Sequence, residues 1–248
     1  MDSAHGLRHE GQGGCNVSET ELVSRPAPPS IWHMYRAMVG VGIVCGLLIV
    51  TAFQVTRPII ERNKAEALQK AIFHVLPNAS TSATYRLDES GGFLVLEGKG
   101  VGAELVYAGY DDNHELMGLA VEAQGMGYQD VIGVIYGYSF AEEAIIGIQV
   151  LESKETPGLG DKIESDPEFL ENFERLDVSL RDDLSEMANP IVPVRHGEKT
   201  HPWEVDGITG ATISSVAIAD ILNRSAQYWM PRIRSHLSDF QGDFQGEE

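Results

Sequence analysis

Hydrophobic positions divide the chain first at one uninterrupted apolar run. Residues 37–56 contain no charged side chain, and at a rise of about 1.5 Å per residue such a run crosses a hydrocarbon core of about 30 Å as a helix. Trp32 and Tyr35 precede the run. Arg36 and Arg57 flank it, as is typical of side chains at a membrane interface. A buried helix of a soluble protein would normally carry a polar stripe, so the pattern predicts a transmembrane helix over 37–56.

A helical pattern and then a series of strand patterns follow this run. Apolar residues at three- and four-residue spacing over 57–77 predict a stalk helix that restarts at Pro58. Short β-rich runs come next, and they lie at 93–97, 104–110, 116–123, 130–139 and 144–153. Turn residues such as Gly, Asp and Asn separate them. Successive strands joined by short turns indicate an antiparallel meander.

The last third of the chain carries mainly helical signals. The order Asp-Pro-Glu at 166–168 suits the N-cap, N1 and N2 positions of a short helix that runs to Phe173. A further short strand is expected at 190–194, and a long helix is expected over 213–237, helical by propensity as far as Pro231. Strands followed by helices indicate an α+β fold. The predicted fold is therefore a single N-terminal transmembrane helix plus a soluble domain of antiparallel strands and helices.

These patterns also predict the domain organisation. In chain order it consists of a disordered tail at 1–36, the transmembrane helix at 37–56, a stalk helix and linker at 57–90, the main domain at 91–237 and an acidic C-terminal tail at 238–248. Three basic residues precede the span and four follow it within 14 residues. Because this difference is small and long domains cross membranes largely regardless of charge, charge alone leaves the orientation open.

Charge and cysteine content exclude several classes of function. The chain has 37 acidic and 18 basic residues, a formal net charge of −19, and such a chain lacks the basic face that a nucleic-acid backbone requires. Four of the acidic and three of the basic residues precede residue 37, so the remaining 33 and 15 leave −18 on the rest. Cys15 and Cys45 are the only cysteines. Disulfide frameworks, cysteine-bound clusters and c-type haem are therefore excluded for the main domain.

Two glycine-rich loops are the candidates for chemistry. Residues 155–162 read ETPGLGDK, and taken alone they suit a plain strand-to-helix turn. Residues 206–215 read DGITGATISS and lead into the last helix. The first turn of a helix has unpaired N–H groups and a positive dipole end, which suit a phosphate. Neither loop has the order of a P-loop or of a Rossmann phosphate loop.

The second loop resembles the covalent flavinylation motif of the FMN-binding domain family. In that family the last Thr of [ST]-G-A-T carries FMN through a phosphoester, which here implies FMN attached to Thr212. The resemblance also implies that a flavin transferase reads residues 206–215, a stretch that contains Asp206, Thr209, Gly210, Ala211 and Ser215. A structural threonine at a helix start is the plain alternative for Thr212.

The companions of this motif narrow the resemblance. ETPGLGDKI at 155–163, GMGYQDVI at 125–132 and the N-terminal span are together similar to the RnfG subunit family of the Rnf ion-translocating electron transport complex. The related NqrC family of sodium-pumping quinone reductases shares ETPGLG and the flavin loop. The resemblance implies that the flavin ring packs against the first loop, at residues Glu155, Thr156, Gly158 and Leu159.

The same resemblance implies a function. It implies an FMN electron-carrier subunit of a membrane oxidoreductase that translocates ions, with no catalytic site of its own. Its partners would be the other subunits of an Rnf-type complex, a flavin transferase during maturation, and membrane lipid through residues 37–56. The subunit would lie in the bacterial inner membrane, with the tail cytoplasmic and the main domain periplasmic.

Other functions stay open. The chain is alternatively an NqrC-like subunit, a membrane-anchored assembly module whose flavin site is vestigial, or a free-standing flavin reductase. His196 and His201 are five residues apart, which fits neither a helical zinc pair nor a zinc finger, and no third ligand is evident. No G-x-S-x-G sequence is present, so a hydrolase triad has no starting point.

Overall fold

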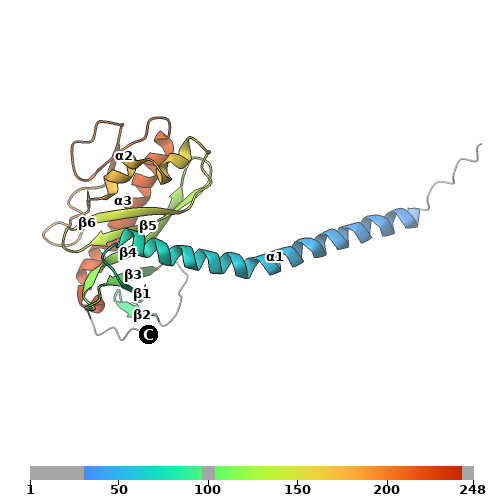
Figure 1. Cartoon of the computed structure of the whole chain (residues 1–248), viewed down its shortest axis with the longest axis horizontal. Coiled ribbons are helices and arrows are strands. Elements are labelled where there is room, and N and C mark those ends of the chain that lie inside the picture. Colours follow the sequence, from blue (N-terminus) through green and yellow to red (C-terminus); the bar gives the residue numbers. More distant parts are fainter. Residues whose placement is uncertain (1–30, 97–103, 242–248) are drawn as a thin grey trace, which may run out of the picture. The chain divides into compact units, whose positions relative to one another are not determined.

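The computed structural model describes residues 31–96 and 104–241, and the chain divides into the units Met1–Thr56 and Arg57–Glu248. Helix α1 (Ile31–Val75) runs from the first unit into the second (Figure 1). Within the described ranges it is the one helix long and apolar enough to span a membrane. The predicted disordered tail lies mostly outside the described residues, apart from 31–36, which already belong to α1.

The stalk does not restart at Pro58, because α1 is continuous through this residue. A proline inside a helix lacks the N–H that would bond the carbonyl of Gln54, four residues earlier. The neighbouring turns remain bonded. Thr56 Oγ1 donates to the carbonyl of Ala52 at 2.7 Å, and Arg57 pairs with Glu61 at 2.8 Å, so one missing hydrogen bond does not end the helix.

The second unit is built on an antiparallel sheet. Its strands, in chain order, are β1 (Thr81–Leu87), β2 (Phe93–Val95), β3 (Leu105–Tyr110), β4 (Leu116–Met126), β5 (Val131–Ser139), β6 (Ala144–Glu152) and β7 (Leu176–Asp177). Their order across the sheet is β2-β1-β3-β4-β5-β6-β7. The predicted meander is confirmed over β3 to β6, where every neighbouring pair is antiparallel. Strand β1 lies in the stretch expected to be a linker; the end of the expected strand 93–97, Glu97, lies outside the described residues.

Both faces of the sheet are covered, which is why every residue of β3 is buried. Val106 and Ala108 belong to a large apolar core that includes α3 (Thr212–Ser235). Leu105 and Tyr107 point the other way, into a smaller core with the last turns of α1. Figure 1 shows α3 and the end of α1 on the sheet. Because side chains alternate between the two faces of a strand, β3 contributes to both cores.

The end of α1 lies close to the sheet because glycines face it. A Cβ atom added to Gly137 of β5 would lie 2.1 Å from the carbonyl oxygen of Val75. One added to Gly109 of β3 would lie 2.9 Å from the side chain of Leu76. No side chain fits at such distances. Glycine in these strands therefore sets where the stalk docks on the domain.

The remaining elements lie after β6. They are the 3₁₀ turn η1 (Gly160–Glu164), α2 (Pro167–Leu170), η2 (Glu171–Phe173), β8 (Val192–Val194), β9 (Glu204–Asp206), α3 and η3 (Leu237–Phe240). The predicted cap is present, since the carboxylate of Asp166 accepts the N–H of Phe169 at 3.2 Å. Strand β8 pairs with β9 in parallel, outside the meander. Helix α3 continues past Pro231 to Ser235.

The sequence predicts an acidic C-terminal tail from residue 238 onward, but the first residues of this segment are packed on the domain. Phe240 is buried, and its carbonyl accepts a hydrogen bond from the hydroxyl of Tyr110 at 2.9 Å. The carboxylate of Asp239 accepts the N–H of Phe93 at 2.9 Å. Ring contacts of Phe240 also tie η3 to β1 and β2. Residues 242–248 of the expected tail lie outside the described residues.

Candidate functional site

Three segments that are distant in sequence meet at the carboxylate of Glu155. This side chain follows β6 and is only 6% exposed. Its Oε1 accepts the backbone N–H groups of Tyr128 at 2.9 Å and Gln129 at 3.0 Å. Its Oε2 accepts the hydroxyl of Ser214, in the first turn of α3. One carboxylate therefore joins the β4–β5 turn, the ETPGLG loop and the start of the last helix.

Glycines leave the space that this carboxylate fills. A Cβ atom at Gly127 would lie 2.6 Å from Glu155 Oε1, and one at Gly160 would lie 2.7 Å from Oε2. Both distances are shorter than van der Waals contact. The glycines Gly127 of GMGYQD and Gly160 of ETPGLG thus both make room for the same carboxylate, although they are far apart in the sequence. The family resemblance implies that Glu155 packs against the flavin ring, and this stays a prediction; the structure places its carboxylate inside the protein, against these three segments.

Thr212 is the first residue of α3 and is exposed. Its hydroxyl lies 3.4 Å from the carbonyl of Ile208. The N-cap residue is Ala211, which has no side chain able to cap, and no acidic residue stands in the first turn. The positive end of a 24-residue helix is therefore left without the side-chain acceptor that most helices have. An anion bound at Thr212 would meet both free N–H groups and a favourable dipole.

The turn that precedes Thr212 is held by buried residues on its inner side. Ser215 is buried, and its hydroxyl contacts the N–H of Ile208 at 3.3 Å and the carbonyl of Ala211 at 3.1 Å. Ala211 is buried as well. Thr209 and Gly210 lie on the exposed outer side of the turn, where Gly210 has φ +88°, a value that favours glycine. Ser215 and Ala211 therefore support the turn, whereas Thr209 and Thr212 are exposed.

Asp206 lies apart from Thr212 and does not point to it. It ends β9, and its carboxylate accepts the N–H of Gly197 at 2.8 and 3.0 Å. The buried side chain of Asn172 bonds both backbone groups of Asp206, at 2.9 and 3.1 Å. Lys199 donates to the same amide oxygen at 3.0 Å; its burial lowers the pKa of the ammonium. Sequence patterns did not single out Asn172, because a lone Asn in a short helical turn carries no motif.

The first loop presents apolar surface beside this helix start. Thr156 is half-buried and its carbonyl accepts the N–H of Leu159 at 3.1 Å. Gly158 has φ +76°, and the side chain of Leu159 is 51% exposed. Tyr128 and Ile213 are exposed too, and each adjoins or belongs to a segment that Glu155 holds. An aromatic ring system would find apolar partners here.

One buried atom of the same loop lacks a partner. Asp161 Oδ1 is enclosed and accepts no hydrogen bond from the described protein. A buried acceptor of this kind is uncommon and costs free energy unless something donates to it. FMN offers a phosphate, a flat apolar ring and ring N–H groups. The uncapped helix start, the exposed apolar side chains and this acceptor fit those three features.

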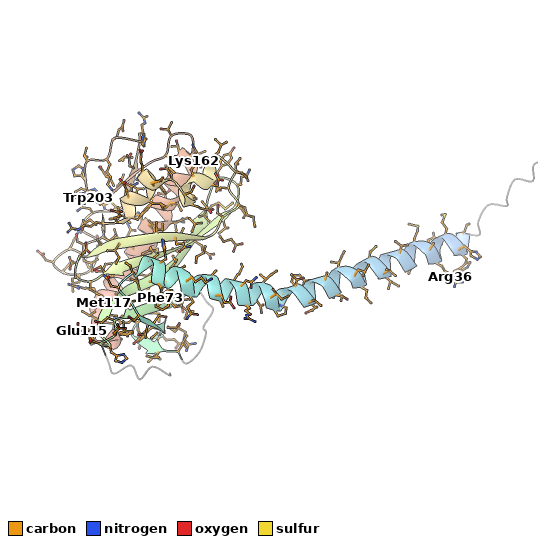
Figure 2. All side chains as sticks on the ribbon, viewed as in Figure 1. Arg36, Phe73, Glu115, Met117, Lys162 and Trp203 are labelled. Carbon is orange, nitrogen blue, oxygen red and sulfur yellow. The ribbon has the colours of Figure 1, made fainter. Side chains whose placement is uncertain are left out.

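The loop lies at one end of the domain. Figure 2 shows Lys162, which belongs to this loop, at the opposite end from Glu115, which belongs to the β3–β4 turn.

The two loop histidines have local partners. His196 lies 3.9 Å from a carboxylate oxygen of Asp206 and 3.8 Å from one of Glu168. His201 lies 3.1 Å from Glu204, whose pKa is lowered to about 2 by hydrogen bonds from neighbouring backbone N–H groups. Within the described ranges, no group of three or more His, Cys, Asp or Glu side chains is placed to hold a metal ion.

Several known proteins are similar to this chain in sequence, and solved structures are similar to it in fold. The family model described as FMN-binding domain matches residues 127–227, a stretch that contains all three segments held by Glu155. The G subunit of the ion-translocating oxidoreductase complex of Methanosarcina acetivorans is 30% identical over 194 residues, which cover 77% of this chain and 90% of that protein. The chain belongs to this family of G subunits of ion-translocating oxidoreductase complexes.

Other G subunits match over shorter stretches. The protein of that name from Escherichia coli K12 is 28% identical over 167 residues, covering 66% of this chain and 75% of its own. The G subunit of the Na(+)-translocating ferredoxin:NAD(+) oxidoreductase complex of Acetobacterium woodii is 33% identical over 125 residues, covering 50% and 54%. These matches agree with the resemblance seen in the sequence motifs.

A solved structure confirms the fold class. The crystal structure of NqrC from Shewanella oneidensis superposes with a TM-score of 0.51 and 19% identity, and covers 73% of this chain and 97% of that one. At this identity the likeness shows the fold alone. The expected α+β fold, with antiparallel strands and helices after an N-terminal apolar helix, is therefore correct.

Proposed function

We propose that this member of the G-subunit family carries FMN on Thr212 and passes electrons within a membrane complex that couples electron transfer to ion translocation. Its relatives carry the name of ion-translocating oxidoreductase subunits, and its domain matches the FMN-binding family. The observation that supports the attachment site is the exposed position of Thr212 at a helix start that has no side-chain cap.

The attachment is an ester between Thr212 Oγ1 and the flavin phosphorus. The donor is a flavin dinucleotide: the bond between its two phosphates breaks, the nucleoside monophosphate leaves, and it takes up the proton that Thr212 Oγ1 loses. A flavin transferase makes this ester and reads the turn at 206–215. Two features support this proposal. Thr209 and Thr212 are exposed, and Ser215 and Asp206 fix the turn from inside and from its start.

The cofactor supplies the electron transfer chemistry, and the residues of this chain bind and orient it. The first turn of α3 offers backbone N–H groups to the phosphate. Tyr128, Leu159 and Ile213 offer apolar surface to the ring. Glu155 holds the segments from which these side chains emerge, so that their spacing is fixed before the flavin arrives. The chain needs no proton-transfer residues of its own for this task.

The membrane arrangement proposed is a single pass in the inner membrane, with the soluble domain periplasmic and residues 1–36 cytoplasmic. The apolar part of α1 supports the single pass, and family resemblance supports the orientation. The acidic second unit is repelled by anionic lipid headgroups. Contact with lipid through 37–56 and with the other complex subunits therefore holds the protein in place.

Electron flux through the complex distinguishes this function from its rivals. The complex is prepared with Thr212→Ala and, as control, with Ser235→Ala, which removes a similar hydroxyl bonded to the carbonyl four residues earlier at the other end of α3. We expect both complexes to assemble, and electron flux to be lost only with Thr212→Ala. Full flux with Thr212→Ala would favour an assembly module with a vestigial site.

A free-standing flavin reductase makes a different prediction. Such an enzyme would reduce a small acceptor as an isolated chain loaded with flavin. We expect the isolated, loaded chain to show no turnover of a small acceptor beyond that of free FMN, whereas its partners in the membrane complex should reduce it.

A further inference from the structure

We propose that the negative charge of Glu155 lowers the reduction potential of the flavin at Thr212. This role rests on the proposed function. Glu155 is the only charged side chain among the buried residues of the described chain. Burying a charge is costly unless it is paired with an opposite charge, so a charge retained in this position calls for a reason beyond packing.

Among the residues that the structure describes, none of opposite charge forms an ion pair with this carboxylate. Its three partners are the backbone N–H groups of Tyr128 and Gln129 and the hydroxyl of Ser214, all of them uncharged. All three of these groups donate to it, which suits a carboxylate. Lys154, the next residue before it, pairs instead with Asp130 at 2.6 Å. The described residues thus hold a net negative charge at this point.

The charge lies beside the attachment site. Ser214, which bonds Glu155 Oε2, follows Thr212 by two residues in the same helical turn. Because a helix rises about 1.5 Å per residue, Thr212 and Ser214 are only a few ångströms apart along its axis. Reduction adds electrons to the flavin, and a negative charge nearby, screened little by water, opposes that addition. Glu155 makes and breaks no bond in this process; it shifts the equilibrium of reduction.

The test is a spectroelectrochemical titration of the full chain, co-expressed with a flavin transferase. Glu155→Gln removes the charge but keeps an oxygen that accepts the two N–H groups. We expect its potential to be at least about 30 mV more positive than that of the natural chain, a tenfold change in the two-electron equilibrium. Glu152→Gln is the matched control, because Glu152 lies three residues away but is exposed and paired with Lys64 at 3.0 Å. Its potential should not change.

A second variant separates charge from loosened packing. Ser214→Ala keeps the carboxylate and removes one donor that stabilises it, so the potential should fall. Opposite shifts in Glu155→Gln and Ser214→Ala support the proposal, because a loosened site would shift both the same way. An unchanged potential in Glu155→Gln, or shifts of one sign in both variants, would overturn it.

Loss of flavin gives a separate outcome. If Glu155→Gln carries none, Ser214→Ala decides, with a fall supporting the proposal and no change or a rise overturning it. If neither variant carries flavin, Glu155 acts in attachment and the redox role is wrong. If the natural chain itself carries no flavin at Thr212, the proposed function fails, and the redox role fails with it.

Discussion

The docking of the stalk on the sheet gives the sharpest structural prediction. Gly137→Ala would place a Cβ atom 2.1 Å from the carbonyl oxygen of Val75. That oxygen belongs to the backbone at the end of a helix, so it cannot turn away as a flexible side chain would. The end of α1 must therefore move by about 1 Å or more to reach ordinary contact distance, or the strand must bend.

The size of the effect follows from what that movement disturbs. Overpacking of a core typically costs about 1–3 kcal/mol. The upper end applies here, because a shift of α1 also loosens the buried side chains of Ile72 and Leu76. We expect a loss of about 3 kcal/mol. For a domain of this size, each kcal/mol lowers the melting temperature by about 2–4 °C, so the expected drop is about 6–12 °C.

The assay is thermal unfolding of the full chain in detergent, followed by near-ultraviolet circular dichroism. Gly133→Ala on the same strand is the matched control, because its Cβ atom would lie 3.7 Å from the Cβ atom of Glu152, an ordinary contact distance. The control should melt within about 2 °C of the natural chain. Equal melting temperatures for Gly137→Ala and Gly133→Ala would refute the claim that close backbone approach fixes the stalk on the sheet.

Two further predictions concern the loops around β9. Asn172→Ala removes both side-chain hydrogen bonds to the backbone of Asp206; it should destabilise the domain by about 2–4 kcal/mol, and an unchanged melting temperature would contradict the assigned role. Glu204 has a pKa lowered to about 2, so its stabilising contacts with the N–H groups of Thr200 and His201 are complete above its usual value of 4.5 and are lost as the pH falls through about 2. Amide shifts of these two residues should titrate near pH 2 in the natural chain and stay flat in Glu204→Gln; a midpoint near 4.5 would count against the contacts.

Periodicity predicted the parts of the fold whose burial leaves a regular pattern. Strands β3 to β6 are long and rich in apolar residues, so both position and type could be read from the sequence. Strand β1 reads TSATYRL, and its polar residues give no strand pattern, so the sequence predicts a linker there. Strands β7 and β9 are too short to show a period. The continuity of α1 through Pro58 could not be foreseen, because it depends on neighbouring turns that remain bonded.

The sequence indicates the two loops of the candidate site, but not the hydrogen bonds that join them. Glycine content and the TGAT order pointed to both loops and to Thr212. The hydrogen bond between Glu155 and Tyr128 joins residues 27 apart, and the one with Ser214 joins residues 59 apart. No local pattern reports such pairs, so the sequence singles out neither Ser214 nor the buried hydrogen bonds of Glu155. The motif groups Asp206 with Thr212 in the stretch that a flavin transferase would read, and this stays a prediction; the structure adds that its carboxylate accepts the N–H of Gly197 in the neighbouring loop.

The central claim is that Thr212 carries the flavin, and peptide mass spectrometry tests it most directly. The full chain is co-expressed with a flavin transferase, denatured and digested, and the peptide that contains Thr212 is measured beside those of Thr212→Ala and Ser235→Ala chains. We expect the added mass of an FMN ester on this peptide in the natural and Ser235→Ala chains, and none in Thr212→Ala. Flavin mass retained after denaturation by Thr212→Ala, or an unmodified Thr212 peptide from a chain that binds flavin elsewhere, would contradict it.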